Sequence, residues 1–121
     1  MKKIEAIIRK TKFNEVREAL HQTGIDFFSF WEVTGVGQAR ESRVYRGIAY
    51  DTTNIERLML SIVIRDKNIE PTVNAIVTAA RTGEIGDGRI FVSDMDEAYR
   101  IRTGEKGEKT LYCEEEDKLK E

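Results

Sequence analysis

The sequence predicts one α+β domain whose elements follow the order β-α-β-β-α-β. Three observations carry this prediction. The 121 residues suffice for a single core but not for two. Four segments have the alternating, β-branched or aromatic side chains typical of strands, and two others repeat apolar residues at helical spacing. This order is the ferredoxin-like, split βαβ arrangement. We expect the domain to span residues 1–107 and a charged tail to span 108–121.

The first half of the chain is expected to hold a strand, a helix and a second strand. Residues 3–9 alternate apolar and polar side chains, which predicts a strand. The helix that follows has Asn14 as its N-cap and Gly24 as a left-handed stop. The aromatic and β-branched run over residues 25–36 favours a second strand whose aromatic rings belong to the core.

The second half begins with a long loop, at about residues 37–54, where hydrophobic periodicity disappears. Loops of this length in small domains are uncommon and are usually functional or disordered. Alternation over residues 58–64 predicts the third strand. Pro71 suits the first turn of a second helix, which we expect Gly83 to end. Residues 89–93 predict the fourth strand.

The predicted third strand is apolar on both of its sides. Met59 and Val63 lie opposite its main apolar row, which consists of Leu58, Leu60, Ile62 and Ile64. Two helices can cover only one face of the sheet, so the second face needs another cover. The strand pattern therefore predicts a homo-oligomer.

Composition and charge exclude several classes of protein. Lys and Arg number 20 against 22 Asp and Glu, which gives no basic footprint for nucleic-acid binding. The single cysteine, Cys113, excludes an internal disulfide and a cysteine zinc cluster. The amino-terminal apolar run ends at Ile8, far short of a signal peptide or membrane span. We expect a cytoplasmic protein with no direct membrane insertion.

The residues give little support for catalysis. His21 is the sole histidine and falls on the polar side of its predicted helix. The serines have no plausible histidine base, and no pair of carboxylates stands in contrasting environments. We therefore expect a protein that is not an enzyme, with a small phosphatase or nucleotidase as the alternative from the enzyme class.

Two segments near the carboxyl end suggest an anion site. Residues 82–89 place three glycines and Arg89 before the fourth strand, and glycine lets backbone amides converge on an anion. Residues 99–102 look extended, so Arg100 and Arg102 would point the same way. Each segment alone could be an ordinary turn or a solvated edge. Together they favour phosphate binding.

Five segments resemble the PII nitrogen-regulatory signal proteins, and in particular the divergent branch associated with ammonium transporters. They are MKKIEAIIR at residues 1–9, GVGQ at 35–38, YRG at 45–47, AARTGEIGDGRIFV at 79–92 and RIRTGEKG at 100–107. The last two motifs are highly specific, and the resemblance covers about residues 1–107.

This resemblance implies a homotrimer with nucleotide sites in the clefts between subunits, where ATP and ADP compete. The residues that match nucleotide-contacting positions are Ile7, Ser29 and Val63 for the adenine, Gly86, Asp87, Gly88, Arg89, Arg100 and Arg102 for the phosphates, and Gly35, Gly37 and Gln38 at the loop entry. No catalytic residue is implied.

The resemblance also implies Mg²⁺ and 2-oxoglutarate as ligands, with Gln38 as the residue that contacts the metal. Arg46 corresponds to a loop-tip arginine that enters the channel of an ammonium transporter, and Tyr50 to a tyrosine that some relatives modify. The alternative is a sensor of ADP or AMP that regulates another transporter, such as a bicarbonate carrier, without sensing 2-oxoglutarate.

Some positions depart from the family pattern. Between Gly37 and Tyr45 the chain is one residue short, so Gln38 is either the family's glutamine shifted in register or no equivalent of it. Arg57 stands where a lysine usually helps to hold 2-oxoglutarate, and an arginine fork does not replace an ammonium group. Ser61 replaces a usual glutamate.

Overall fold

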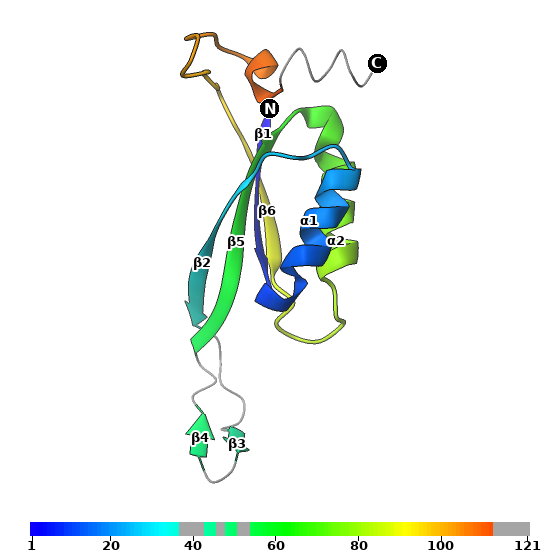
Figure 1. Cartoon of the computed structure of the whole chain (residues 1–121), viewed down its shortest axis with the longest axis vertical. Coiled ribbons are helices and arrows are strands. Elements are labelled where there is room, and N and C mark those ends of the chain that lie inside the picture. Colours follow the sequence, from blue (N-terminus) through cyan, green and yellow to red (C-terminus); the bar gives the residue numbers. More distant parts are fainter. Residues whose placement is uncertain (37–42, 46–47, 51–53, 113–121) are drawn as a thin grey trace.

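The computed structural model describes residues 1–36, 43–45, 48–50 and 54–112. Its main sheet has four antiparallel strands in the order β2-β5-β1-β6. They are β1 (Lys2–Ile8), β2 (Ser29–Val36), β5 (Asn54–Ile64) and β6 (Arg89–Asp94). Figure 1 shows this sheet beside a single helical layer.

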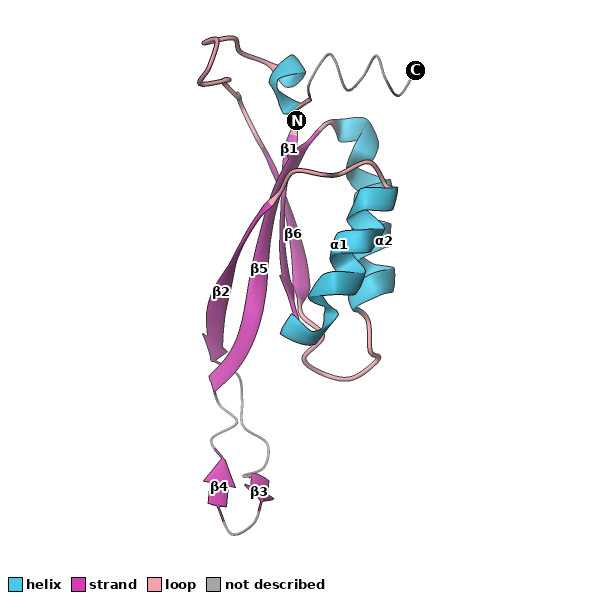
Figure 2. Cartoon of the chain, in the orientation of Figure 1, coloured by secondary structure: helices cyan, strands magenta, loops and turns pink. Residues whose placement is uncertain are grey.

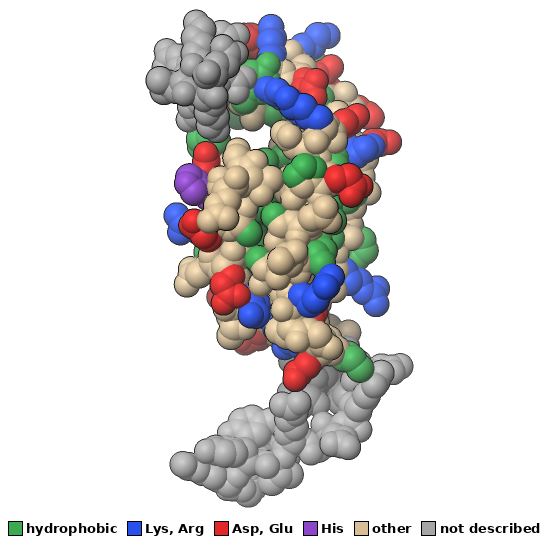
Figure 3. Space-filling view, turned by 90° about the vertical axis from the view of Figure 1, so that its right-hand side faces the viewer, with side chains coloured by type: hydrophobic (Ala, Val, Ile, Leu, Met, Phe, Trp, Pro, Cys, Tyr) green, Lys and Arg blue, Asp and Glu red, His purple; other side chains and the backbone are tan. Residues whose placement is uncertain are grey.

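The two helices are α1 (Phe13–Gln22) and α2 (Ile69–Ala80), and both cover the same face of the sheet (Figure 2). Short 3-10 turns precede them at Lys10–Lys12 and Asp66–Asn68. The predicted β-α-β-β-α-β order is therefore confirmed, with β2 and β5 as its second and third strands. Charged side chains of both signs are interspersed on the helix side of the molecule (Figure 3).

The helix ends agree only in part with the sequence-based prediction. Gly24 has φ +89° just after α1, as predicted for a left-handed stop, and Pro71 lies in the first turn of α2. The N-cap of α1 is Lys12, not Asn14, and no side chain caps it. Gly83 does not end α2, because Arg81 is already extended. Its φ of +89° belongs to the turn that leads to β6.

One apolar core lies between the sheet and the helices. It is formed by alternate residues of β1 and β5 together with one face of each helix. Its most buried members are Ile4, Ala6, Ile8, Leu60, Ile62, Val16, Leu20 and Ile76. The alternation that predicted these two strands is therefore the pattern that fills the core.

The aromatic run was wrongly predicted to be a strand and core throughout. The segment before Ser29 is not strand, and the backbone amide of Ile25 donates to Leu20 O at 2.8 Å, where it closes the end of α1. Phe28 packs against the core, whereas Trp31 stays 45% exposed. The reason is topological: β2 is an edge strand, and Trp31 lies opposite Met59 on the face that the helices do not cover.

Two further segments differ from the predictions. Within the long loop, β3 (Arg43–Tyr45) and β4 (Ile48–Tyr50) pair as a small antiparallel hairpin, seen beyond the ends of β2 and β5 in Figure 1. Residues 99–102 are not extended. Tyr99 forms a bridge with Lys106, and residues 101–103 turn the chain back.

Candidate functional site

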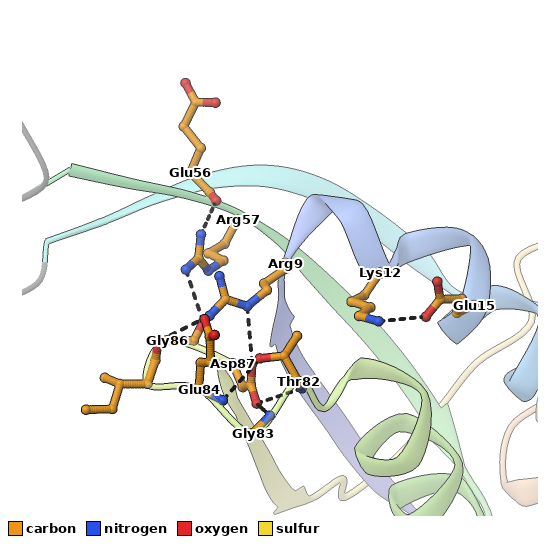
Figure 4. A network of polar contacts seen from close by, with 11 residues as sticks. Arg9, Lys12, Glu15, Glu56, Arg57, Thr82, Gly83, Glu84, Gly86 and Asp87 are labelled. Atoms are coloured by element: carbon orange, nitrogen blue, oxygen red, sulfur yellow. Dashed lines mark hydrogen bonds and ion pairs between the residues drawn. The ribbon is translucent and has the colours of Figure 1, made fainter. Parts of the chain in front are cut away.

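The turn between α2 and β6 is organised by the carboxylate of Asp87. That carboxylate accepts hydrogen bonds from the backbone amides of Thr82 and Gly83, each at 2.9 Å, and from the hydroxyl of Thr82. Arg9 Nε, from the end of β1, donates to it at 3.2 Å (Figure 4). The Thr82 hydroxyl and these amides hold the pKa of the Asp87 carboxyl well below its usual range.

Two guanidinium groups lie against the same turn. Arg9 Nη2 donates to Ile85 O at 3.1 Å, and Arg57 Nη2 donates to Gly86 O at 3.0 Å. Figure 4 shows both arginines reaching the turn from the strands beside it. Burial and the neighbouring charge of Arg9 lower the pKa of the Arg57 guanidinium. The turn therefore faces two adjacent cations.

Position 88 requires a glycine because its backbone lies very close to the first strand. A Cβ added there would lie 1.7 Å from Ile7 O, and the residue has φ +106°. Only glycine lets the turn pass directly over the end of β1. The predicted site residues Ile7 and Gly88 are thus brought into contact.

A first cavity of about 630 Å³ lies at this end of the sheet. Predicted site residues from three elements line it together with Arg57. They are Ile7 of β1, Gly35 of β2 and Gly86, Asp87, Gly88 and Arg89 of the turn and β6. These residues are far apart in sequence, and the sheet brings them to one edge.

A second cavity, of about 1080 Å³, lies at the other end of the sheet. It holds the remaining predicted residues that the structure describes, which are Ser29, Val63, Arg100 and Arg102. The strand register separates the two cavities. In β1, Ile7 is next to the last residue, whereas Val63 pairs with Lys3 near the start of the strand.

The paired arginines share this second cavity, but not because the segment is extended. Residues 100–104 form a turn closed by the bond from Gly104 N to Arg100 O, at 2.7 Å. Arg100 Nη2 donates to Lys109 O at 3.1 Å and to Tyr112 O at 3.0 Å. The short 3-10 turn Glu108–Leu111 is thereby held against Arg100.

Three predicted residues, Gly37, Gln38 and Arg46, lie outside the described residues. Within the described ranges, no group of three or more His, Cys, Asp or Glu side chains could hold a metal ion. In the same ranges, no helix is long and apolar enough to cross a membrane.

Sequence reasoning missed four residues that build these cavities. Arg9 and Thr82 bind Asp87, and the Arg65 guanidinium lies 3.5 Å from the ring centre of Tyr112. Arg9 and Asp87 are 78 positions apart, so no local spacing links them. The sequence holds one sign alone, which is that Arg9 is the last residue of the predicted first strand.

The fold and the site define a small ferredoxin-like protein with a cationic glycine turn and a separate arginine-lined cavity.

The family model described as nitrogen regulatory protein P-II matches residues 1–105. Three nitrogen regulatory P-II proteins illustrate the similarity. That of Cereibacter sphaeroides is 47% identical over 109 residues, covering 89% of this chain and 97% of the relative. That of Azospirillum brasilense is 45% identical over 108 residues, covering 88% and 96%. That of Microchaete diplosiphon is 46% identical over 107 residues, again covering 88% and 96%. The chain belongs to the nitrogen regulatory protein P-II family.

Proposed function

We propose that the protein is a cytoplasmic signal protein that binds ATP and ADP in clefts between the subunits of a homotrimer. Through its long loop it regulates nitrogen assimilation by acting on an ammonium transporter. The observation that carries the nucleotide proposal is the glycine turn 82–88, whose backbone is held by the fully engaged carboxylate of Asp87 and is contacted by the guanidinium groups of Arg9 and Arg57.

The chemistry of this turn favours a phosphate group. Within the described part of the chain, the backbone amides of Gly86 and Gly88 donate to no acceptor. Arg57 and Arg89 line the same cavity. Backbone amides that converge without partners, close to fixed positive charge, form an anion-binding concavity.

The separation of the two cavities supports a site shared between subunits. In one chain the glycine turn and the pair Arg100 and Arg102 lie at opposite ends of the sheet. One bound triphosphate would contact both groups only if a second copy brought its arginine end against the glycine turn of the first. The sheet face without helices exposes Trp31 and Phe91 and offers an apolar surface for that packing.

Gln38 and the phosphate oxygens would hold Mg²⁺ in this proposal. Mg²⁺ usually takes few protein ligands and several oxygens from phosphate and water. The metal would neutralise charge on the phosphates. A dicarboxylate such as 2-oxoglutarate would then contact Arg57.

The position of Arg57 favours the second candidate function. Its Nη1 donates to Glu56 O at 2.8 Å and its Nη2 to Gly86 O at 3.0 Å, so both ends of the fork already hold carbonyls. A dicarboxylate that uses the same N–H groups would have to displace them. This observation supports a sensor of ADP or AMP that acts on another transporter, such as a bicarbonate carrier, without 2-oxoglutarate.

Calorimetric titration of the purified protein tests the proposal. We expect Arg100→Ala and Arg102→Ala each to lower ATP or ADP affinity at least tenfold, or about 1.4 kcal/mol. Arg17→Ala, which removes the same charge from the exposed side of α1, is the control. If both arginine variants bind as the parent does, the phosphate assignment is wrong.

Two further measurements separate the alternatives. Pull-down of an ammonium transporter with each nucleotide, with and without 2-oxoglutarate, distinguishes the first candidate from the second. Steady turnover of ATP or an acyl phosphate at saturating substrate would instead indicate a small phosphatase.

A further inference from the structure

We infer that the side-chain carboxylate of Asp87 positions the glycine turn and contacts neither the nucleotide nor its metal ion. Arg9 is its partner in this role. The inference rests on the proposed function, because it concerns how the turn is prepared to receive phosphate.

The hydrogen bonds of Asp87 leave its carboxylate no room for another ligand. A carboxylate offers about four acceptor positions, two on each oxygen. Oδ1 accepts from the Thr82 hydroxyl and from Arg9 Nε, and Oδ2 accepts from the amides of Thr82 and Gly83. All four positions are filled from within the chain, so a metal ion could bind Asp87 only by breaking the turn.

These bonds also sort the backbone amides of the turn into two groups. The amides of Thr82 and Gly83 are used by Asp87, and the amide of Glu84 donates to the Thr82 hydroxyl oxygen at 3.2 Å. The Asp87 amide closes the tight turn over Ile85 and Gly86, whereas the amides of Gly86 and Gly88 have no acceptor in the described part of the chain. The carboxylate thus closes the first half of the turn and leaves the second half free for an anion.

Arg9 fixes this arrangement to the sheet. Its Nε binds the Asp87 carboxylate, while its Nη2 binds the carbonyl of Ile85 at 3.1 Å (Figure 4). One planar side chain therefore holds two points of the turn at the end of β1. Because both points are fixed before a ligand arrives, binding need not order the turn, and less conformational entropy is lost.

The negative charge of Asp87 would repel a phosphate group if the carboxylate had no hydrogen-bond donors around it. Four donors, one of them a guanidinium, surround the carboxylate, and the Asp87 side chain is only 25% exposed. Arg57 and Arg89 then stand against one further acid in the cavity lining, Glu84, so positive charge is in excess. The turn can thus contain an acid and still attract an anion.

Titrations of the full-length protein with ATP, ADP and AMP test this inference. Asp87→Asn places amide protons against the donors of Thr82 and Gly83, so we expect ATP affinity to fall about tenfold. The loss should shrink from ATP to AMP as phosphates are removed. It should also be equal in Mg²⁺ and in EDTA, because the carboxylate holds backbone and not metal.

Glu84→Gln is the matched control, since it removes the same charge from the same turn. Thermal melting shows whether each variant is folded. Should Asp87→Asn fail to fold, Thr82→Val removes one donor to the carboxylate at constant volume, and its ATP affinity should fall about threefold.

Three results would overturn the inference: an unchanged ATP affinity in both variants, an equal loss for all three nucleotides, or a loss confined to solutions with Mg²⁺. The last result would make Asp87 a metal ligand. Failure of the parent protein to bind any adenine nucleotide would instead refute the proposed function, so the two failures are distinguishable.

Discussion

The guanidinium of Arg100 donates to the backbone carbonyl of Tyr112, 3.0 Å away and twelve positions further along the chain. The same arginine also binds Lys109 O, and the ring of Tyr112 packs against Arg65. Tyr112 thus lines the cavity of Arg100 and Arg102, beyond the residues that the family model matches. Both carbonyls bind Nη2 of Arg100, so a phosphate that uses this nitrogen must displace them.

Loosening this contact should therefore strengthen nucleotide binding. Tyr112→Ala removes the ring that packs on Arg65, an interaction of about 1 kcal/mol, so we expect ATP affinity to rise about threefold to fivefold. Tyr112→Phe keeps the ring and should bind as the parent does. Calorimetric titration measures both. A weaker affinity in Tyr112→Ala would show that the carboxyl-terminal turn helps to hold the nucleotide.

The open face of the sheet gives a prediction about assembly. Phe91 is 51% exposed and lies opposite Glu5 on the face without helices. A carboxylate in its place would be buried beside another carboxylate if that face packs on other subunits. We expect the parent to sediment as a trimer and Phe91→Glu as a monomer. Asn14→Glu adds the same charge on α1 and should leave the trimer intact; a parent that is monomeric at all concentrations contradicts the prediction.

Much of the fold follows from local pattern. Alternation in β1 and β5 was predictive because both strands lie inside the sheet, where one face packs on the helices. The aromatic residues in the run 25–36 did not predict burial, because the exposure of side chains on an edge strand depends on which elements pack against that strand. Trp31 has the composition of a core residue, yet it faces away from the helices.

The site was predictable to a smaller extent. The glycine tract and the pair Arg100 and Arg102 stand out in the sequence by their density. Contacts between residues far apart in the sequence cannot be recognised in this way. Arg9 contacts Asp87 only because β1 and β6 are neighbours in the sheet. Tyr112 was placed in the charged tail by the sequence, and only the fold shows that its carbonyl reaches Arg100.

The contact between Gly88 and β1 predicts a large effect on stability. Gly88→Ala would set a Cβ 1.7 Å from Ile7 O at φ +106°, so backbone must move, at a cost of about 3 kcal/mol or more. Gly83→Ala is the control, because it has φ +89° but nothing within 4 Å, and should cost about 1–2 kcal/mol. Urea unfolding measures both changes. Equal losses in the two variants would mean that only the positive φ matters.

The hydrogen bonds of Asp87 predict how stability depends on pH. They hold the pKa of its carboxyl below the ordinary value of 3.8, with the Thr82 hydroxyl as the largest cause. A carboxyl whose pKa is depressed by folding stabilises the native state fully above its unfolded pKa. This contribution is lost as the pH falls toward the folded value.

We therefore expect the free energy of unfolding of the parent to fall steadily as the pH is lowered below about 4. Asp87→Asn should be less stable than the parent at pH 7, and the difference between the two should narrow with acidification. Urea unfolding followed by fluorescence of Trp31, the single tryptophan, measures this at constant protein concentration. A difference that stays constant down to pH 2 would mean that the charge of Asp87 does not contribute to holding the turn.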